Sequence, residues 1–291
     1  MPSLKDLKVR IGSVKNTQKI TKAMKMVAAA KLRRAREAAE ASRPYAERME
    51  QMVSSLATGV TGSDAPILLS GTGKEEKHLI VVATSDRGLC GGFNATIIKS
   101  TREKVRLLLS QGKTVGLYYV GRKGYDVLKR EFGHLTVDKI LDATKKKIEY
   151  GIAEQVAADA TGNIGGEDGW DVVTIVYNRF VSAISQEVTW QQLVPLALPE
   201  TDEKAEVLPY EYEPDEATIL TDLLPRNVSM QIFSALLENA ASEQGARMSA
   251  MDNATRNAGE MIKKLTLQYN RSRQAAITKE LIEIISGAEA V

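Results

Sequence analysis

Apolar residues recur at helical spacing at the start of the chain, at Leu4, Leu7, Ile11 and Val14. Intervals of three and four residues place such positions on one face of an α-helix. The strict pattern slips at Gln18 and then resumes at Ile20, Met24 and Val27. We expect one long N-terminal helix over 1–58, in which an alanine-rich stretch allows close contact with a second helix.

A second helical seam runs through the C-terminal part of the chain. Pro225 suits a helix start, and no proline follows it. Intervals of three and four residues then continue without interruption through Met248, Met251, Thr255, Ala258, Ile262, Leu265, Tyr269, Ser272 and Ala276. This pattern predicts a coiled-coil helix over 225–291. A plain structural coiled coil would account for these residues as well.

Between these helices the hydrophobic period changes. Short apolar runs predict strands over 79–83, 114–120, 171–180 and 187–196. Helix-like segments lie between them, at 96–109 and 152–160. This alternation indicates an α/β unit with parallel strands that ends in a hairpin.

The chain therefore divides into four parts. They are an N-terminal coiled-coil helix over 1–58, a central α/β domain over 77–198, an acidic connector over 199–224 and a C-terminal coiled-coil helix over 225–291. The predicted fold class is α/β, with a long antiparallel coiled coil of the terminal helices and a central Rossmann-like domain.

Composition removes several classes of protein. An apolar fraction of 43% and a charged fraction of 26% argue against wholesale disorder and against a polytopic membrane protein. A single cysteine and two histidines exclude a disulfide framework and a zinc site of the Cys/His type. We expect an intracellular protein without a metal or a cofactor.

Charge is distributed unevenly along the chain. Residues 1–36 contain eleven Lys and Arg and only one acid, Asp6, although the whole chain has a net charge of only +2. Such a segment could meet an acidic partner, bind nucleic acid, form a transit peptide or be a solvated helix face. It is rich in Lys rather than in Arg and Ser, and no aromatic residue for base stacking precedes Tyr45. The acidic partner is the preferred interpretation.

The turn Ser85–Asn94 follows a strand and precedes a helix, where α/β folds commonly bind phosphate. It matches neither G-x-G-x-x-G nor the P-loop pattern. Cys90 lies in this turn and could act as a nucleophile only if folding brought His78 or His134 beside it. The sequence contains no convincing catalytic constellation, so a structural turn or a protein contact is the preferred reading.

Five motifs occur in order along nearly the whole chain, at 16–29, 42–45, 85–94, 241–251 and 277–288. The first contains Asn-Thr-Gln-Lys-Ile-Thr-Lys-Ala-Met, the fourth Ala-Ser-Glu-Gln-Gly-Ala-Arg-Met, and the last Ile-Thr-Lys-Glu-Leu-Ile-Glu-Ile-Ile-Ser-Gly-Ala. Together they resemble the γ subunits of F-type ATP synthases.

This resemblance implies a non-catalytic central stalk without a cofactor. The coiled coil would enter a ring of three α and three β subunits, and the α/β domain would lie outside the ring near ε and the c-ring. Proton-driven rotation would then move the β subunits through their states of ATP synthesis or hydrolysis. An inhibitor subunit is a further expected partner, and nucleic acid is not. The complex would hold the chain at the cytoplasmic face of a bacterial inner membrane, with an organellar matrix as the alternative.

The resemblance also assigns residues. Those that resemble the family's coupling region and its contacts with β are Met24, Gln244, Arg247, Arg273, Gln274, Thr278 and Glu280. A basic face of Lys15, Lys19, Lys22 and Lys25 would meet acidic loops of β. Cys90 corresponds to the end near ε and the c-ring, and Gly245 stands where the family often has Ala, which suggests a bend. The rival hypotheses are a nucleotide-binding α/β protein with helical arms and a basic coiled-coil adaptor for nucleic acid.

Overall fold

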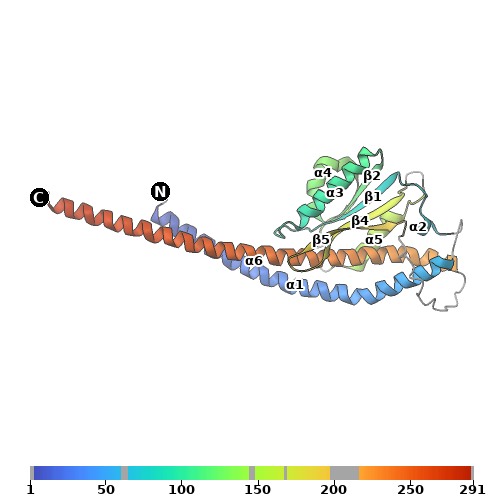
Figure 1. The fold of residues 1–291 in the computed structure, drawn as a ribbon, viewed down its shortest axis with the longest axis horizontal. Helices are drawn as coiled ribbons and strands as arrows, with labels where there is room; N and C mark the ends of the chain where they lie inside the picture. Colours follow the sequence, from blue (N-terminus) through green and yellow to red (C-terminus); the bar gives the residue numbers. More distant parts are fainter. Residues whose placement is uncertain (1–2, 60–64, 144–147, 167–168, 197–215, 290–291) are drawn as a thin grey trace. The chain divides into compact units, whose positions relative to one another are not determined.

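The computed structural model describes residues 3–59, 65–143, 148–166, 169–196 and 216–289 (Figure 1). The chain forms two compact units, one from Met1–Ala29 with Arg247–Val291 and the other from Ala30–Ala246. Two long helices, α1 (Leu4–Gly59) and α6 (Glu216–Glu289), contribute to both units. This confirms the two predicted terminal helices, and each unit is described by itself below.

The first unit pairs the beginning of α1 with the end of α6. Every predicted seam position of α6 except Ala276 is buried or half-buried, including Met251, Ala258 and Leu265. Thr21 contacts Thr255, and Lys25 contacts Asp252, so residue numbers rise along one helix as they fall along the other. The helices are therefore antiparallel, as the sequence predicted.

The predicted seam of α1 is wrong at Ile20 and Val27, although Met24 is half-buried as predicted. Ile20 and Val27 have exposed fractions of 59% and 57%, whereas Gln18 is half-buried and Thr21 is buried. The spacing of three and four residues in fact continues through these polar side chains to Ala28, which is buried. The helix keeps a constant face toward α6, and polar residues occupy that face where the sequence pattern seemed to slip.

A five-stranded sheet forms the centre of the second unit. Its strand order is β3-β2-β1-β4-β5, in which the first four strands are parallel and β5 is antiparallel to β4. The strands are β1 (Lys77–Ala83), β2 (Thr114–Val120), β3 (Thr136–Ile140), β4 (Val172–Phe180) and β5 (Gln186–Val194). The Rossmann-like order and the final hairpin agree with the sequence prediction, and β3 is an element that it missed.

Helices cover both faces of the sheet (Figure 1). Ile80 and Val82 of β1 face the cluster that includes α3 (Phe93–Ser110) and α4 (Arg122–Phe132). Leu79 and Val81 face the opposite cluster, which includes α5 (Tyr150–Thr161) and part of α6. A four-residue helix, α2 (Ile67–Ser70), and a 3₁₀ turn, Gly133–Leu135, complete the elements of the described residues. Alternate residues of β1 therefore serve two separate cores.

The predicted start of the C-terminal helix is also wrong. Helix α6 begins at Glu216 and contains Pro225. Leu220 and Leu224, in the turns before this proline, are buried against a cluster that contains Met49 and Val53 of α1. Tertiary packing thus holds helical structure on both sides of Pro225, although proline lacks an N–H group for the helix ladder. Of the predicted connector, residues 199–215 lie outside the described part.

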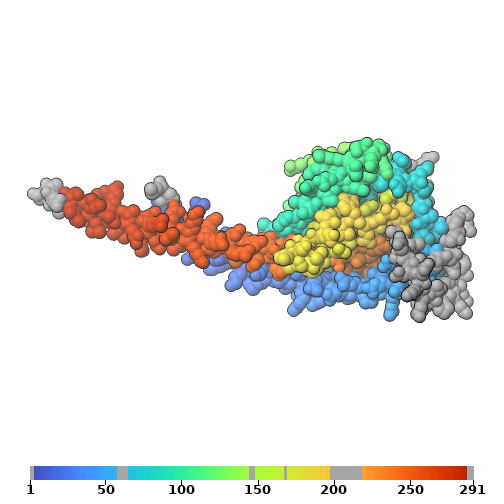
Figure 2. All heavy atoms as spheres, in the orientation of Figure 1, coloured from blue at the N-terminus to red at the C-terminus, as the bar shows by residue number. Residues whose placement is uncertain are grey.

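Gly245 is explained by close packing. Helix α6 continues through this position. A Cβ atom there would lie 3.0 Å from Cε2 of Phe180 and 3.4 Å from Cα of Ala183. Figure 2 shows the β4–β5 segment in yellow against the orange part of α6. The missing side chain lets the hairpin approach the helix.

Asp171 ties the entry of β1 to the start of β4. Its carboxylate accepts hydrogen bonds from the Thr72 hydroxyl at 2.6 Å and from the backbone N–H groups of Glu76 and Lys77 at 3.0 and 2.9 Å. Desolvation opposes ionisation of this buried group, but the three hydrogen bonds outweigh it and lower the pKa of Asp171. The ionised carboxylate is therefore part of the folded structure.

We expect Asp171→Asn to lower the free energy of unfolding at pH 7 by about 2 kcal/mol, because a neutral amide replaces the ionised acceptor and can accept from both backbone N–H groups only if its N–H₂ group faces the Thr72 hydroxyl. The pKa of Asp171 is lower in the folded state, so its contribution is fully present above the unfolded pKa and is lost as pH falls through the folded value. Urea unfolding should show the difference between wild type and variant shrinking below about pH 4.

The matched control is Asp126→Asn, which breaks a surface pair with Lys129 on one helix. A difference between Asp171→Asn and wild type that stayed constant down to pH 3 would contradict the assigned role of the Asp171 carboxylate.

Candidate functional site

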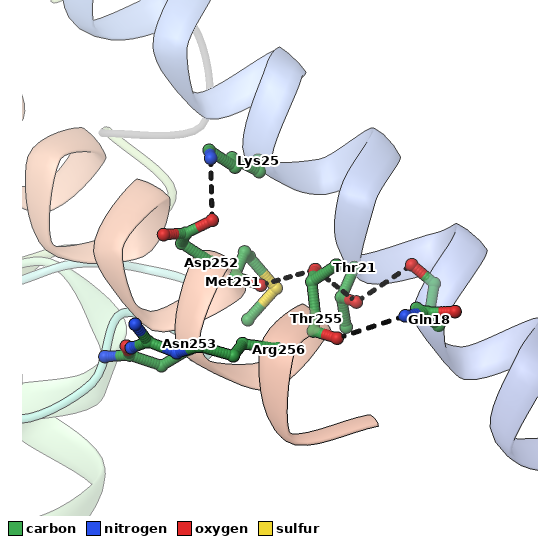
Figure 3. Close-up of polar contacts among 8 residues, drawn as sticks. All are labelled: Gln18, Thr21, Lys25, Met251, Asp252, Asn253, Thr255 and Arg256. Carbon is green, nitrogen blue, oxygen red and sulfur yellow. Dashed lines mark hydrogen bonds and ion pairs between the residues drawn. The ribbon is translucent and has the colours of Figure 1, made fainter. Parts of the chain in front are cut away.

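A polar layer interrupts the apolar seam of the paired helices in the first unit (Figure 3). The Thr255 hydroxyl hydrogen-bonds with the Thr21 hydroxyl at 2.7 Å, and it also lies 2.7 Å from the carbonyl oxygen of Met251. The Gln18 amide donates to the carbonyl oxygen of Thr255 at 3.4 Å. These side chains connect α1 to α6 by hydrogen bonds where neighbouring layers use apolar contacts.

A glycine on α6 makes room for this layer. A Cβ atom at Gly259 would lie 3.0 Å from Nε2 of Gln18. Glycine in a helix interior costs about 1 kcal/mol relative to alanine. Here it leaves space for the amide beside Thr255. Gln18 and Gly259 therefore fit one another, and axial displacement of either helix would separate them.

Lys25 and Asp252 form an ion pair across the same helices, with Nζ and Oδ1 2.6 Å apart. The hydrogen bond from Lys25 lowers the pKa of Asp252. Lys15, Lys19 and Lys22 are exposed, whereas Lys25 is half-buried at the edge of the seam. The structure thus separates Lys25 from the other three members of the predicted basic face.

The residues predicted for the coupling region do not converge on one place. Met24 is half-buried near the polar layer, beside Lys25 in the sequence. Arg273, Gln274, Thr278 and Glu280 are exposed on the last turns of α6. Asp252 lies opposite Lys25, so Arg273 is some 21 residues, or about 30 Å of helix, farther along α6. The structure therefore presents two candidate contact regions.

The last turns of α6 expose apolar side chains. Ile277, Leu281, Ile282, Ile284 and Ile285 have exposed fractions between 49% and 68%. The Thr278 hydroxyl donates to the carbonyl oxygen of Gln274 at 2.9 Å, which is a bond within the helix. A contiguous apolar surface of this kind is typical of a protein contact.

Gln244 and Arg247 lie on successive turns of α6, and both are half-buried. The Gln244 amide donates to the carboxylate of its neighbour Glu243 at 3.4 Å. Both side chains remain partly accessible, as a contact with another subunit requires.

The turn that contains Cys90 is closed by its own side chains. Asn94 accepts from the Ser85 N–H at 3.0 Å and donates to Cys90 Sγ at 3.3 Å. Asp86 accepts from the N–H groups of Arg122 and Asp142, each at 2.9 Å. The thiol is only 1% exposed. This arrangement supports the hypothesis that the turn has a structural role.

Neither histidine can assist Cys90. His78 lies at the beginning of β1, whereas Cys90 follows the end of that strand. His134 precedes β3, which runs parallel to β1 through β2 and therefore begins at the same edge of the sheet as β1. Both imidazoles are thus at the edge opposite the thiol, and the hypothesis of an assisted Cys90 nucleophile is wrong.

Two other features are absent from the part of the chain that the structure describes. No group of three or more His, Cys, Asp or Glu side chains there is placed to hold a metal ion. No helix in this part of the chain has an apolar stretch long enough to cross a membrane.

Comparison with known proteins gives the family of this long helix pair and α/β domain. A family model described as ATP synthase matches residues 3–291. The chain is 60% identical over 291 residues to the ATP synthase gamma chain of Fuscovulum blasticum, with 100% of each chain covered. The chain belongs to the γ-chain family of the F-type ATP synthases. It has the central-stalk role of that family.

Other relatives agree with this assignment. The gamma chain of Paracoccus denitrificans is 60% identical over 292 residues, and that of Chelativorans is 57% identical over 291, with 100% of each chain covered in both comparisons. A chain of the central stalk and c-ring structure from Tetrahymena thermophila has a TM-score of 0.61 and 28% identity, covering 81% of this chain and 99% of that chain. A Euglena gracilis rotor chain, at 21% identity and a TM-score of 0.70, supports the fold; 94% of this chain and 98% of that one are covered.

The polar layer of this γ chain is a feature that the sequence prediction missed. The apolar pattern slips at Gln18, the family motif that contains Gln18 names no partner for it, and neither gives a role to Gly259. Thr255 was predicted on the seam, but its partner could not be named from the sequence. The apparent slip was the available signal, because the spacing of three and four residues continues through Gln18 and Thr21.

A double-mutant cycle tests the cross-helix bond. We expect Thr255→Val in this γ chain to cost about 1 kcal/mol of unfolding free energy, because the buried Thr21 hydroxyl loses a partner. In the Thr255→Val background, Thr21→Val should lower the free energy of unfolding by less than it does in the wild-type chain. The difference, a coupling energy of about 1 kcal/mol, is measured by urea unfolding.

Thr266→Val is the matched control, since the Thr266 hydroxyl bonds only to the carbonyl of Ile262 on its own helix, at 2.7 Å. A cycle of Thr21 with Thr266 should show no coupling. Equal coupling energies in the two cycles would show that the Thr21–Thr255 bond is not specific.

Proposed function

We propose that this chain is a non-catalytic rotor that couples turning of the c-ring to the conformational cycle of the catalytic β subunits. The observation that carries the proposal is the family match along residues 3–291. The geometry agrees with it, because the paired helices expose charged and apolar surfaces suited to protein contacts. In the α/β domain, the turn after β1 is filled by Asn94 and by the buried thiol of Cys90.

The mechanism requires contacts that change with angle rather than reacting groups. A rotating helix pair presents a different surface to each β subunit in turn. Each contact favours one β conformation over the others, so rotation changes their relative free energies. In one direction this releases ATP formed from ADP and phosphate, and in the other direction hydrolysis of ATP drives the rotor.

Specific surfaces fit these contacts. The exposed Lys15, Lys19 and Lys22 provide a positive face for acidic loops of β. The polar surface at Arg273–Glu280 and the apolar end of α6 form a second region, which would turn within an apolar sleeve of the ring. Met24, Gln244 and Arg247 are proposed as further contacts with β.

In the proposed assembly, the helix pair of one copy of this chain enters a ring of three α and three β subunits. The α/β domain lies outside the ring, near ε and the c-ring. The turn that contains Cys90 is proposed to lie near ε and the c-ring. The chain is peripheral and is held by the complex at the cytoplasmic face of a bacterial membrane. Its bacterial relatives support this placement.

The direct test is reconstitution with separately purified cognate α and β subunits. We expect one copy of this chain to join three αβ pairs on sizing, with a large gain in ATP hydrolysis, because the stalk gives the three β subunits different conformations. A chain that stays apart and leaves turnover unchanged would count against the proposal. Micromolar ATP binding by the isolated chain would favour a nucleotide-binding α/β protein instead.

A charge-reversal variant tests the basic face. Lys15→Glu, Lys19→Glu and Lys22→Glu together should raise the chain concentration needed for half-maximal activation about tenfold at low salt, with a smaller effect at high salt. Lys25 is left unchanged because its ion pair with Asp252 belongs to the helix pair itself.

Three exposed lysines of α3 and α4, Lys99, Lys104 and Lys129, form the matched control. Their reversal to Glu changes net charge equally but should leave half-maximal activation unchanged. An identical shift in both triple variants would indicate an effect of net charge and would contradict a role for the basic face.

A further inference from the structure

Strand β4 continues beyond the end of its partner β1. Backbone pairing between these strands ends at Val82 and Val176. Asn178 and Phe180 follow on β4, and their N–H groups point away from β5 because residues two apart on a strand share a direction. Two backbone donors at this edge of the sheet thus need acceptors from another element.

Helix α6 supplies both acceptors from consecutive residues. The Asn239 side-chain oxygen accepts from the Asn178 N–H at 3.0 Å, and the Glu238 carboxylate accepts from the Phe180 N–H at 3.1 Å. Asn178 and Asn239 are only 1% and 2% exposed. The side chains of α6 therefore replace the missing strand over this part of β4.

The same place is joined to α3 and to α1. The Asn178 amide donates to the carbonyl oxygen of Phe93, at the start of α3, at 3.1 Å. On the other side, Arg43 of α1 donates to Glu238 at 3.4 Å. The guanidinium of Arg36 lies 5.7 Å from the centroid of the Phe180 ring, within the range of a cation–π contact.

This location is where a Rossmann-like domain would bind a nucleotide. The strand order reverses between β1 and β4, and ligands of open α/β sheets bind outside the carboxyl ends of the strands at such a point. Here Asn178, Asn239 and the start of α3 fill that position with hydrogen bonds to one another. The α/β domain therefore binds helix α6 of the same chain at the position where related folds bind a nucleotide.

We propose that Glu238 and Asn239 are positioning residues that form a torsionally stiff joint between the α/β domain and the long helices. This proposal rests on the rotor function proposed above, since torque applied to the α/β domain must reach α1 and α6. One hydrogen bond would act as a pivot. Two bonds to alternate N–H groups of one strand fix both the position and the angle of the sheet relative to this part of α6.

Burial makes the joint selective for one arrangement. Turning the sheet about α6 would leave the buried Asn178 N–H without an acceptor, which is unfavourable because the group would stay desolvated without a compensating hydrogen bond. The glycine at position 245 contributes by letting Phe180 and Ala183 approach the helix closely. Rigid attachment is thus favoured by hydrogen bonds and by shape together.

The test uses the complex of α, β and this chain, with a bead attached to the α/β domain. Attachment is through Lys99→Cys and Glu103→Cys, which are exposed on α3, in a Cys90→Ala background. Angular fluctuations of the bead are recorded during pauses at limiting ATP. We expect Asn239→Leu to raise their variance about twofold, because it removes one of the two backbone bonds.

Glu238→Gln is a milder second variant. It keeps an acceptor for the Phe180 N–H but loses its charge interaction with Arg43. We expect a smaller rise in the variance of the bead angle than for Asn239→Leu, because both backbone hydrogen bonds remain. Glu238→Gln keeps the volume of the side chain and one acceptor, so it can test the joint even if Asn239→Leu prevents assembly.

Arg106→Gln is the matched control, since it breaks a 2.9 Å ion pair with Glu131 between α3 and α4 and leaves Glu238 and Asn239 unchanged. A merely structural role would lower thermal stability in all variants without changing the variance. If an assembled Asn239→Leu or Glu238→Gln complex had the same angular variance as wild type, the proposed joint would be wrong. Failure of the rotor proposal would appear differently, as absence of rotation in the wild-type sample as well.

Discussion

The antiparallel pairing of α1 with α6 is the constraint on which both units of this chain depend. In the first unit the two helices form the whole core, through a seam that includes Leu7, Ala28 and Leu265. In the second unit the same two helices pack Met49 and Val53 against Leu220 and Leu224. Hydrophobic burial along this contact outweighs the local effect of proline at positions 44 and 225.

Hydrophobic period was enough to predict most of the fold. Strands β1, β2, β4 and β5 were found because their apolar runs are buried in the sheet. Strand β3 and helix α4 were missed, since β3 is a short edge strand with three exposed central residues and α4 begins in a Gly-Arg-Lys-Gly segment that resembles a loop. The start of α6 was misplaced because the sequence shows Pro225 but not the α1 surface that holds the helix around it.

Some residues of the candidate sites could also be predicted from the sequence, and others could not. Exposed residues such as Arg273 and Glu280 could be proposed from motifs, because a surface residue needs no partner within the chain. The pairs Gln18 with Gly259 and Phe180 with Glu238 could not be predicted. Their members lie 241 and 58 residues apart, and only the folded chain brings them together. Interactions that fix the register of helices or hold a domain in place are therefore the part that sequence patterns leave out.

The α/β domain shows why fold alone does not determine function. Its strand order provides the edge at which related folds bind nucleotides, yet Asn178 there bonds to Asn239 of α6 and to the backbone of Phe93. A ligand would have to displace bonds that are buried and within the same chain, so the helix competes without loss of translational freedom. In this chain, the edge of the sheet that binds ligands in related folds attaches the α/β domain to helix α6. An attachment of this kind fits the function proposed for this chain, in which it transmits force and its partner subunits carry out the chemistry.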